Sequence, residues 1–113
     1  MSHPFLRGVV LRHVYYAISI ASVVTMAKHP KMLTLVLMLL LLVAVADAKV
    51  RLAYVAANMI GFPLIESIAV GMSQHTWVYV HPMSTLPVPQ WLFSLWGLAS
   101  VWISDIFRLV HKP

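Results

Sequence analysis

The stretch MLTLVLMLLLLVAVA, residues 32–46, decides the fold class, because it consists almost entirely of Leu, Val and Met. The chain as a whole has 113 residues, of which 61% are hydrophobic and only 10% are charged. An average soluble domain is about a quarter charged and under half apolar, and a small domain keeps a large fraction of its surface exposed. Lipid must therefore cover the apolar excess, and we expect one membrane domain over residues 1–113.

Four apolar segments have roughly the length that a bilayer requires. They cover residues 9–27, 32–48, 52–73 and 91–110. A spanning helix needs roughly 17–25 residues, and the second segment reaches this length only if Asp47 and Lys49 snorkel toward the headgroups. The pattern predicts an all-α, polytopic integral membrane protein with four short transmembrane helices. The alternative is three spans plus one interfacial helix.

The connections between the segments favour four spans. Residues 29–31, His-Pro-Lys, separate the first two segments, and the polar residues 47–51 separate the second from the third. Between residues 74 and 90 several prolines exclude a continuous helix: Pro82, Pro87 and Pro89. Amphipathic aromatic rings settle at the headgroup level, and three of them flank this connection: Trp77, Tyr79 and Trp91. We therefore expect residues 74–90 to form an interfacial connection.

The basic residues predict an orientation. The net charge is +5, from eight Lys or Arg and three acids, and the basic residues are dispersed at the ends of apolar runs, which argues against nucleic-acid binding. With four spans, one side of the membrane carries six of them: Arg7, Arg12, Lys49, Arg51, Arg108 and Lys112. The other side carries Lys28 and Lys31. We predict both termini on the cytoplasmic-equivalent side of an unidentified membrane, with Arg12, Arg51 and Arg108 as interface anchors.

Small residues predict the helix contacts, because close backbone approach favours them in lipid. One set recurs in the third segment: Ala53, Ala57 and Gly61. Another recurs in the fourth: Gly97, Ser100 and Ser104. Glu66 lies about 140° around the helix from the first set, so we place the third helix centrally and expect the second to be the most exposed to lipid. Pro63, with Gly61 nearby, predicts a kink at about residues 59–63.

Glu66 is the residue that an apolar span explains least. It lies in GFPLIESIAVG, residues 61–71, where a charged acid costs at least a few kcal/mol and desolvation would favour its neutral form. Its candidate partners are Thr25, Ser94, Trp96, Ser73 and His75, and with Asn58 they suggest an intramembrane polar site of Glu66, Asn58, Ser94 and Thr25. The site either binds a proton, a cation or another subunit, or is a neutral Glu bonded to a carbonyl that Pro63 frees.

The other two acids suggest interfacial ion pairs. Asp47 lies beside Lys49 and Arg51, and Asp105 lies three residues before Arg108 on one helical face. Exposed pairs of this kind contribute little energy. We therefore expect neither acid to have a functional role.

No catalytic or metal-binding pattern is present in the sequence. There is no cysteine, the six histidines lack the spacing of metal ligands, and no phosphate-binding or nucleophile motif occurs. We therefore expect no metal, no cofactor and no catalysis, and interpret the chain as an accessory or assembly subunit of a larger membrane complex, with lipid and other membrane subunits, or copies of itself, as partners. The alternatives are a homo-oligomeric channel or proton-linked transporter that uses Glu66, and a membrane-embedded lipid or isoprenoid enzyme.

Overall fold

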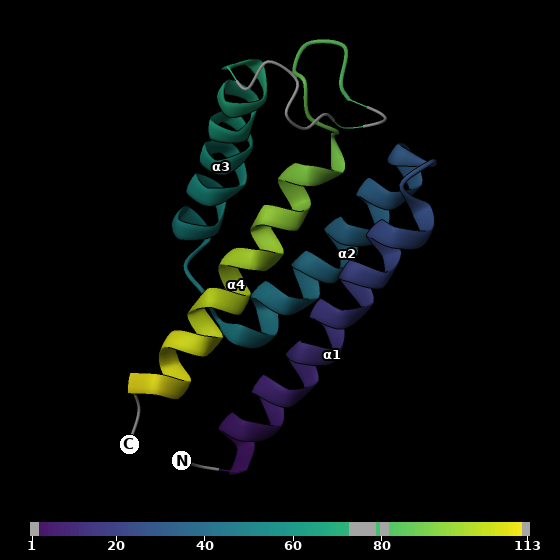
Figure 1. The fold of residues 1–113 in the computed structure, drawn as a ribbon. Coiled ribbons are helices and arrows are strands. Elements are labelled where there is room, and N and C mark those ends of the chain that lie inside the picture. The colour runs from purple at the N-terminus through teal and green to yellow at the C-terminus, as the bar shows by residue number, and fades with distance from the viewer. Residues whose placement is uncertain (1–2, 73–78, 80–81, 112–113) are drawn as a thin grey trace.

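The computed structural model describes residues 3–72, 79 and 82–111, and these form four α-helices (Figure 1). The helices are α1 (His3–Met26), α2 (Pro30–Ala48), α3 (Leu52–Met72) and α4 (Trp91–His111). Each is long and apolar enough to cross a membrane, with lengths of roughly 28–36 Å at 1.5 Å per residue against a hydrocarbon core about 30 Å thick. The predicted all-α, four-helix membrane fold is confirmed, and α1 begins six residues earlier than expected.

The ends of α2 follow from local chemistry. Pro30 occupies the first turn, where a missing N–H is tolerated. At the other end Lys49 adopts the left-handed conformation, with φ 55° and ψ 42°, and its N–H donates to the carbonyl of Val45 over 2.9 Å. A left-handed residue of this kind stops a helix and turns the chain, so α3 can start three residues later.

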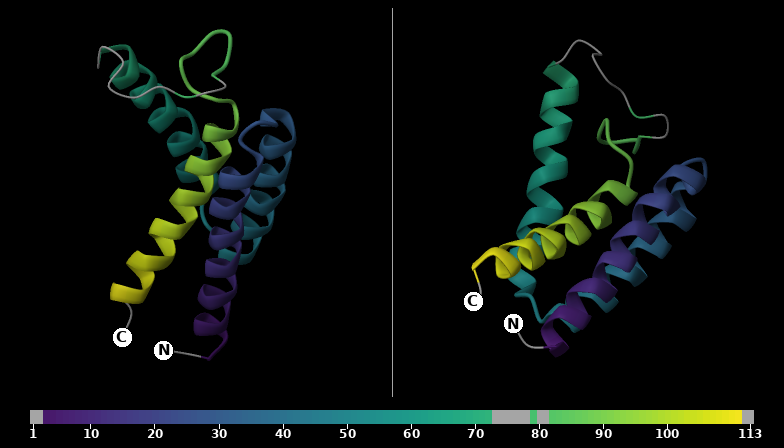
Figure 2. Two further views of the ribbon diagram at one scale, coloured as in Figure 1. Left: turned by 45° about the vertical axis from the view of Figure 1, so that its right-hand side comes forward. Right: turned by 60° about the horizontal axis from the view of Figure 1, so that its bottom comes forward.

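The central helix of the bundle is α4. It packs against α1, α2 and α3, whereas α3 packs chiefly against α4. Figure 2 shows α3 diverging from the hairpin that α1 and α2 form. The prediction that α3 is central is therefore wrong. So is the prediction that α2 is the most lipid-exposed helix, since a smaller share of both α1 and α3 is buried.

The contact between α2 and α4 explains this arrangement. One side of α2 is buried along its whole length: Leu33, Leu37, Leu41, Ala44 and Ala48. On α4 the small residues Ser94, Gly97 and Ser100 are buried, which lets the backbones approach. A Cβ added at Gly97 would lie 2.8 Å from both Leu41 Cδ2 and Met59 Cγ. Gly97 is thus where α2 and α3 both reach α4.

The chain enters and leaves the bundle at the same end. The start of α1 and the end of α4 lie together, and the end of α3 and the start of α4 lie at the opposite end (Figure 1). Pro63 lies inside the continuous helix α3, and Ser67 Oγ donates to its carbonyl over 2.8 Å. The predicted kink there stays a prediction.

Candidate functional site

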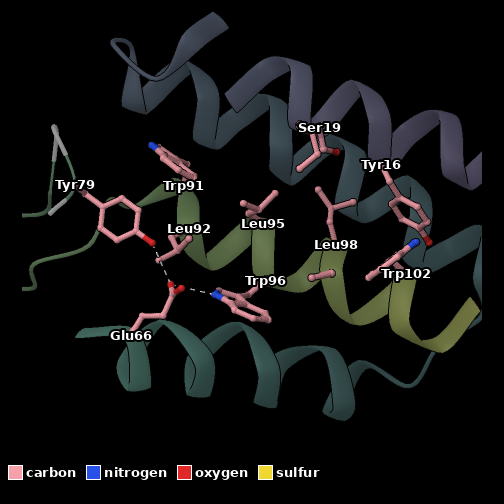
Figure 3. Close-up of a pocket in the computed structure, with 12 residues that line it drawn as sticks. Tyr16, Ser19, Glu66, Tyr79, Trp91, Leu92, Leu95, Trp96, Leu98 and Trp102 are labelled. Atoms are coloured by element: carbon pink, nitrogen blue, oxygen red, sulfur yellow. Dashed lines mark hydrogen bonds between the residues drawn. The ribbon is translucent and has the colours of Figure 1, made fainter. Parts of the chain in front are cut away.

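An apolar groove with a volume of about 530 Å³ runs along α4 between α1 and α3 (Figure 3). The side chains of α4 form most of its wall: Trp91, Leu92, Leu95, Trp96, Leu98 and Trp102. From Trp91 to Trp102 the helix rises about 16 Å. Tyr16 and Ser19 of α1 border one side, and Glu66 of α3 borders the other.

Glu66 is held at one end of this groove by two donors. Its Oε2 accepts a hydrogen bond from Trp96 Nε1 over 3.2 Å and another from the Tyr79 hydroxyl over 3.4 Å (Figure 3). Phe62, one turn before Glu66, stacks on Trp96 with ring centroids 4.4 Å apart. Tyr79 meets Trp91 edge to face with centroids 6.3 Å apart. Aromatic contacts therefore fix the direction of both donors.

Tyr79, which lies outside the helices, acts as a neutral donor. Burial raises the pKa of its phenol, and the charge of the neighbouring Glu66 and the hydrogen bond to it raise this pKa further. The proton thus stays on the hydroxyl and points at the carboxyl group. Glu66 consequently serves as the acceptor in this arrangement.

At the far end of the groove the polar atoms are already engaged. The Tyr16 hydroxyl donates to Asp105 Oδ2 over 2.6 Å. Trp102 Nε1 donates to His13 Nε2 over 3.2 Å, and His13 Nδ1 lies 2.8 Å from the carbonyl of Val9. The two bonds together assign the hydrogen of this imidazole to Nδ1. This end therefore presents its aromatic faces to the groove.

A buried ion cluster lies behind Tyr16 and joins three helices. Arg12 of α1 is only 4% exposed and Asp105 of α4 is fully buried. Arg12 Nε donates to Asp105 Oδ2 over 2.8 Å, and Arg12 Nη2 donates to Oδ1 over 2.7 Å, a bidentate pair. Arg12 Nη1 also donates to Asp47 Oδ2 of α2 over 2.7 Å. The cluster thus fixes α1, α2 and α4 relative to one another.

This cluster corrects the predicted ion pairs. Asp105 pairs with Arg12, and Arg108 instead donates to the carbonyl of Ala48 over 2.8 Å. Asp47 also pairs with Arg12, not with Lys49 or Arg51. Arg12 is therefore a buried partner and not a headgroup anchor. The bidentate hydrogen bonds of a planar guanidinium to a carboxylate stabilise the fold more than an ion pair between neighbours on one helix does. These hydrogen bonds are short, and burial shields them from water.

The structure brings one predicted partner, Trp96, to Glu66 and leaves the other polar residues bonded elsewhere. Thr25 Oγ1 donates to the carbonyl of Ala21 over 2.8 Å, and Asn58 Nδ2 donates to that of Tyr54 over 3.0 Å. Ser94 Oγ lies 3.6 Å from Met38 Sδ. Three residues with predicted roles, Ser73, His75 and Trp77, lie outside the described residues.

The predicted packing residues and anchors fall into two groups. Some are enclosed or half-enclosed by the bundle: Gly97, Ser100, Ser104, Trp91 and Arg108. Others face outward: Ala53, Ala57 and Arg51 are exposed, and Gly61 is half-exposed. A Cβ added at Gly61 would meet no atom of another residue within 4 Å, apart from its chain neighbours and the local helix backbone.

Sequence reasoning missed Tyr79 as a partner of Glu66 and Arg12 as a partner of Asp105. A usable signal did exist for the ion pair. Arg12 lies in the first span and Asp105 in the last, both toward the end where the chain starts and finishes, and opposite charges at one depth attract strongly in lipid. Matching charges by depth, and not by sequence distance, would have made the two residues candidates for a pair, although it would not have shown that they face each other.

The comparisons with known proteins add no family to this picture. Within the described residues, no three His, Asp or Glu side chains converge as metal ligands would. No protein-family model, curated protein or solved structure matches the chain. The function is therefore inferred from the groove, the ion cluster and the exposed side of α3.

Proposed function

We propose that this chain is a small, non-catalytic multi-pass membrane protein that acts as an accessory or assembly subunit of a larger membrane complex. The observation that carries the proposal is that α3 packs chiefly against α4, which leaves a face of small residues open. We call Ala53, Ala57 and Gly61 the outer face of α3. Ala53 and Ala57 are exposed, and the space beside Gly61 is open.

The rotation of α3 supports this assignment. At 100° per residue, Glu66 lies about 140° from Gly61, so one side of the helix meets α4 and the groove while the outer face looks away. Leu64 and Ile68 continue that face and are 42% and 62% exposed. Small residues beside bulky apolar ones suit close contact with another membrane helix.

The two alternative functions fit the geometry less well. A channel or proton-linked transporter would need Glu66 to face water, whereas its carboxyl group bonds to Trp96 and Tyr79 beside apolar groove walls. A lipid enzyme would need, beside Glu66, a second group that transfers a proton and has a pKa near the operating pH. The pKa of Tyr79 is raised above its ordinary value, so its hydroxyl keeps its proton near neutral pH and serves as a hydrogen-bond donor, not as a group that transfers a proton.

The orientation belongs to the same proposal, with both termini on the cytoplasmic-equivalent side. Arg12 is buried in the ion cluster, which leaves five basic residues on that side against two on the other. Lys112, one of the five, lies outside the described residues. The excess of Lys and Arg still has the sign that the positive-inside rule requires.

Site-directed cross-linking in native membranes tests the subunit role. Because the chain has no cysteine, Ala57→Cys introduces a single thiol on the outer face, to which a photoactivatable cross-linker is attached. The matched control is Ala46→Cys, at an exposed alanine of α2. We expect a discrete heterologous product from position 57, in fixed stoichiometry with this chain, and none from position 46.

Gly61→Leu provides a second arm, because its side chain would occupy the open space on the outer face. We expect this variant to fold and to lose the co-purifying subunit. If position 57 cross-linked only to copies of the same chain, the outer face would mediate homo-oligomerisation, and the accessory role would be wrong. Cross-links only to lipid would overturn the proposal.

A further inference from the structure

We propose that the groove beside Glu66 holds one lipid-like molecule, with a hydrogen-bond-donating head group, a hydroxyl or an amine, at Glu66 and one apolar chain along α4. This inference concerns the face of α3 opposite to the proposed subunit contact. It does not depend on that contact.

The head group follows from the hydrogen bonds of Glu66. Trp96 Nε1 can only donate, and Tyr79 donates through its neutral hydroxyl, so the protein presents Glu66 Oε2 with two donors. A carboxylate has about four acceptor positions, and two donors do not fill them. A ligand that adds a further donor completes the site, whereas a head group that can only accept hydrogen bonds leaves the remaining acceptor positions unpaired.

The apolar chain follows from the length and lining of the groove. Beyond Glu66 the groove continues past Leu95, Leu98 and Ala99, with Ile20 on the α1 side. Its length of about 16 Å along α4 is roughly half of the ~30 Å hydrocarbon core, which is the depth of one leaflet. The volume of about 530 Å³ lies within the ~300–1,000 Å³ typical of small-molecule sites.

The polarity of the two ends fixes the direction of the ligand. At the Glu66 end a carboxyl group retains acceptor capacity. At the other end Tyr16 and Trp102 already donate to Asp105 and His13, so their rings offer an apolar surface. The head group therefore belongs at Glu66, on the side of the connection between α3 and α4, and the end of the chain belongs near Trp102.

A helix from another subunit fits this groove poorly. An α-helix with side chains is about 10 Å across, so a 16 Å length occupies roughly 1,200 Å³. This exceeds twice the groove volume of about 530 Å³, so a helix would lie across the mouth of the groove and leave its depth unfilled. An extended hydrocarbon chain is thin enough to enter between α1 and α3.

Tryptophan quenching tests the inference, because Trp91, Trp96 and Trp102 line the groove. The full chain is placed in phosphatidylcholine nanodiscs and titrated with nitroxide-labelled stearyl alcohol, stearylamine, stearic acid and methyl stearate. At a pH that keeps stearic acid ionised, we expect saturable quenching by the alcohol or the amine at about tenfold or more lower concentration than by the acid and the ester, because the ionised acid and the ester have no proton to donate to Glu66. The arms for the alcohol and the amine identify which head group the site prefers.

Two variants separate the head group from the chain. Glu66→Leu removes the acceptor, and we expect the preference for the alcohol or amine over the ester to disappear. Ala99→Phe keeps Glu66 and fills the groove, and we expect saturable quenching by every probe to be lost. The matched control, Ala46→Phe on the exposed side of α2, should behave as the unmodified chain, and circular dichroism verifies that each variant is helical.

Several outcomes would overturn the inference. One is non-saturable quenching of equal strength by all four probes, which describes bulk lipid. Another is an unchanged head-group preference in Glu66→Leu. A third is a cross-link from Ala99→Cys to another polypeptide in native membranes, which would place a helix in the groove.

Discussion

Arg12 and Asp105 are buried charges that compensate each other across the bundle. Removing one partner of a buried pair is strongly destabilising, because the remaining charge has no counter-ion. We expect Asp105→Asn to lower the free energy of unfolding by about 3–5 kcal/mol, measured by circular dichroism during titration with a denaturing detergent.

Asp47→Asn is the matched control for that variant. The Asp47 side chain also bonds to Arg12 but is 42% exposed, so its loss should cost about 1 kcal/mol or less. Equal effects of the two substitutions would contradict the view that burial, and not the ion pair as such, determines the cost.

Tyr79 provides a prediction about pH. Its pKa in the folded protein is raised above the value of about 10 for an unfolded chain. Its contribution to stability is therefore fully present below about pH 10 and is lost as the pH rises through the folded pKa. The absorbance of phenolate at 295 nm, as the difference between the unmodified chain and Tyr79→Phe, should show a midpoint above that of free tyrosine.

Glu66→Gln supplies the control for the titration. Because the Glu66 charge contributes to the shift and burial is its larger cause, we expect the midpoint to fall only part of the way toward the ordinary value. A midpoint at or below the ordinary value in the unmodified chain would show that Tyr79 is neither buried nor bonded to Glu66.

At the scale of helices, Gly97 and Gly61 form a natural pair of test positions. A Cβ at position 97 would lie 2.8 Å from side-chain atoms of α2 and α3, whereas a Cβ at position 61 meets open space. We expect Gly97→Ala to destabilise the bundle by about 1–3 kcal/mol through overpacking. Gly61→Ala should be neutral or stabilising by up to about 1 kcal/mol, because alanine favours the helix.

The same detergent titration measures both glycine variants. If Gly97→Ala were as well tolerated as Gly61→Ala, α4 would not be the helix on which α2 and α3 converge.

The helices could be predicted from the sequence, but their packing could not. The length of each apolar run can be read from the sequence and compared with the length of a spanning helix, so the number and type of helices follow directly. In α2, however, leucine occupies both sides: Leu33 and Leu37 are buried, while Leu35 and Leu39 are 61% and 56% exposed. Periodicity cannot identify the buried side when every side is apolar.

The candidate site shows a similar limit. Trp96 could be predicted as a partner of Glu66 because the two residues lie at a similar depth on neighbouring spans. The contact of Arg12 with Asp105 joins residues 93 positions apart and depends on how α1 and α4 are rotated about their axes. That rotation is set by side-chain packing, which no local pattern in the sequence reports.

At the scale of the whole molecule, the orientation can be tested without altering any Lys or Arg. His29→Cys and Leu52→Cys place single thiols at exposed positions at opposite ends of α2. We expect a membrane-impermeant maleimide to label position 29 in sealed vesicles whose cytoplasmic-equivalent side faces inward, and position 52 only after permeabilisation. The reverse pattern would invert the proposed orientation, and labelling of both positions in the sealed vesicles would contradict the four-span topology itself.

The ion cluster also has a consequence for biogenesis. During synthesis Arg12 enters the membrane with the first helix, while its main counter-ion, Asp105, is made in the last. Until then the guanidinium must remain near the headgroups, which its long side chain permits. A chain interrupted after the third helix would leave Arg12 with Asp47 alone, whose side chain is 42% exposed, so the guanidinium gains its buried counter-ion only when α4 is in place.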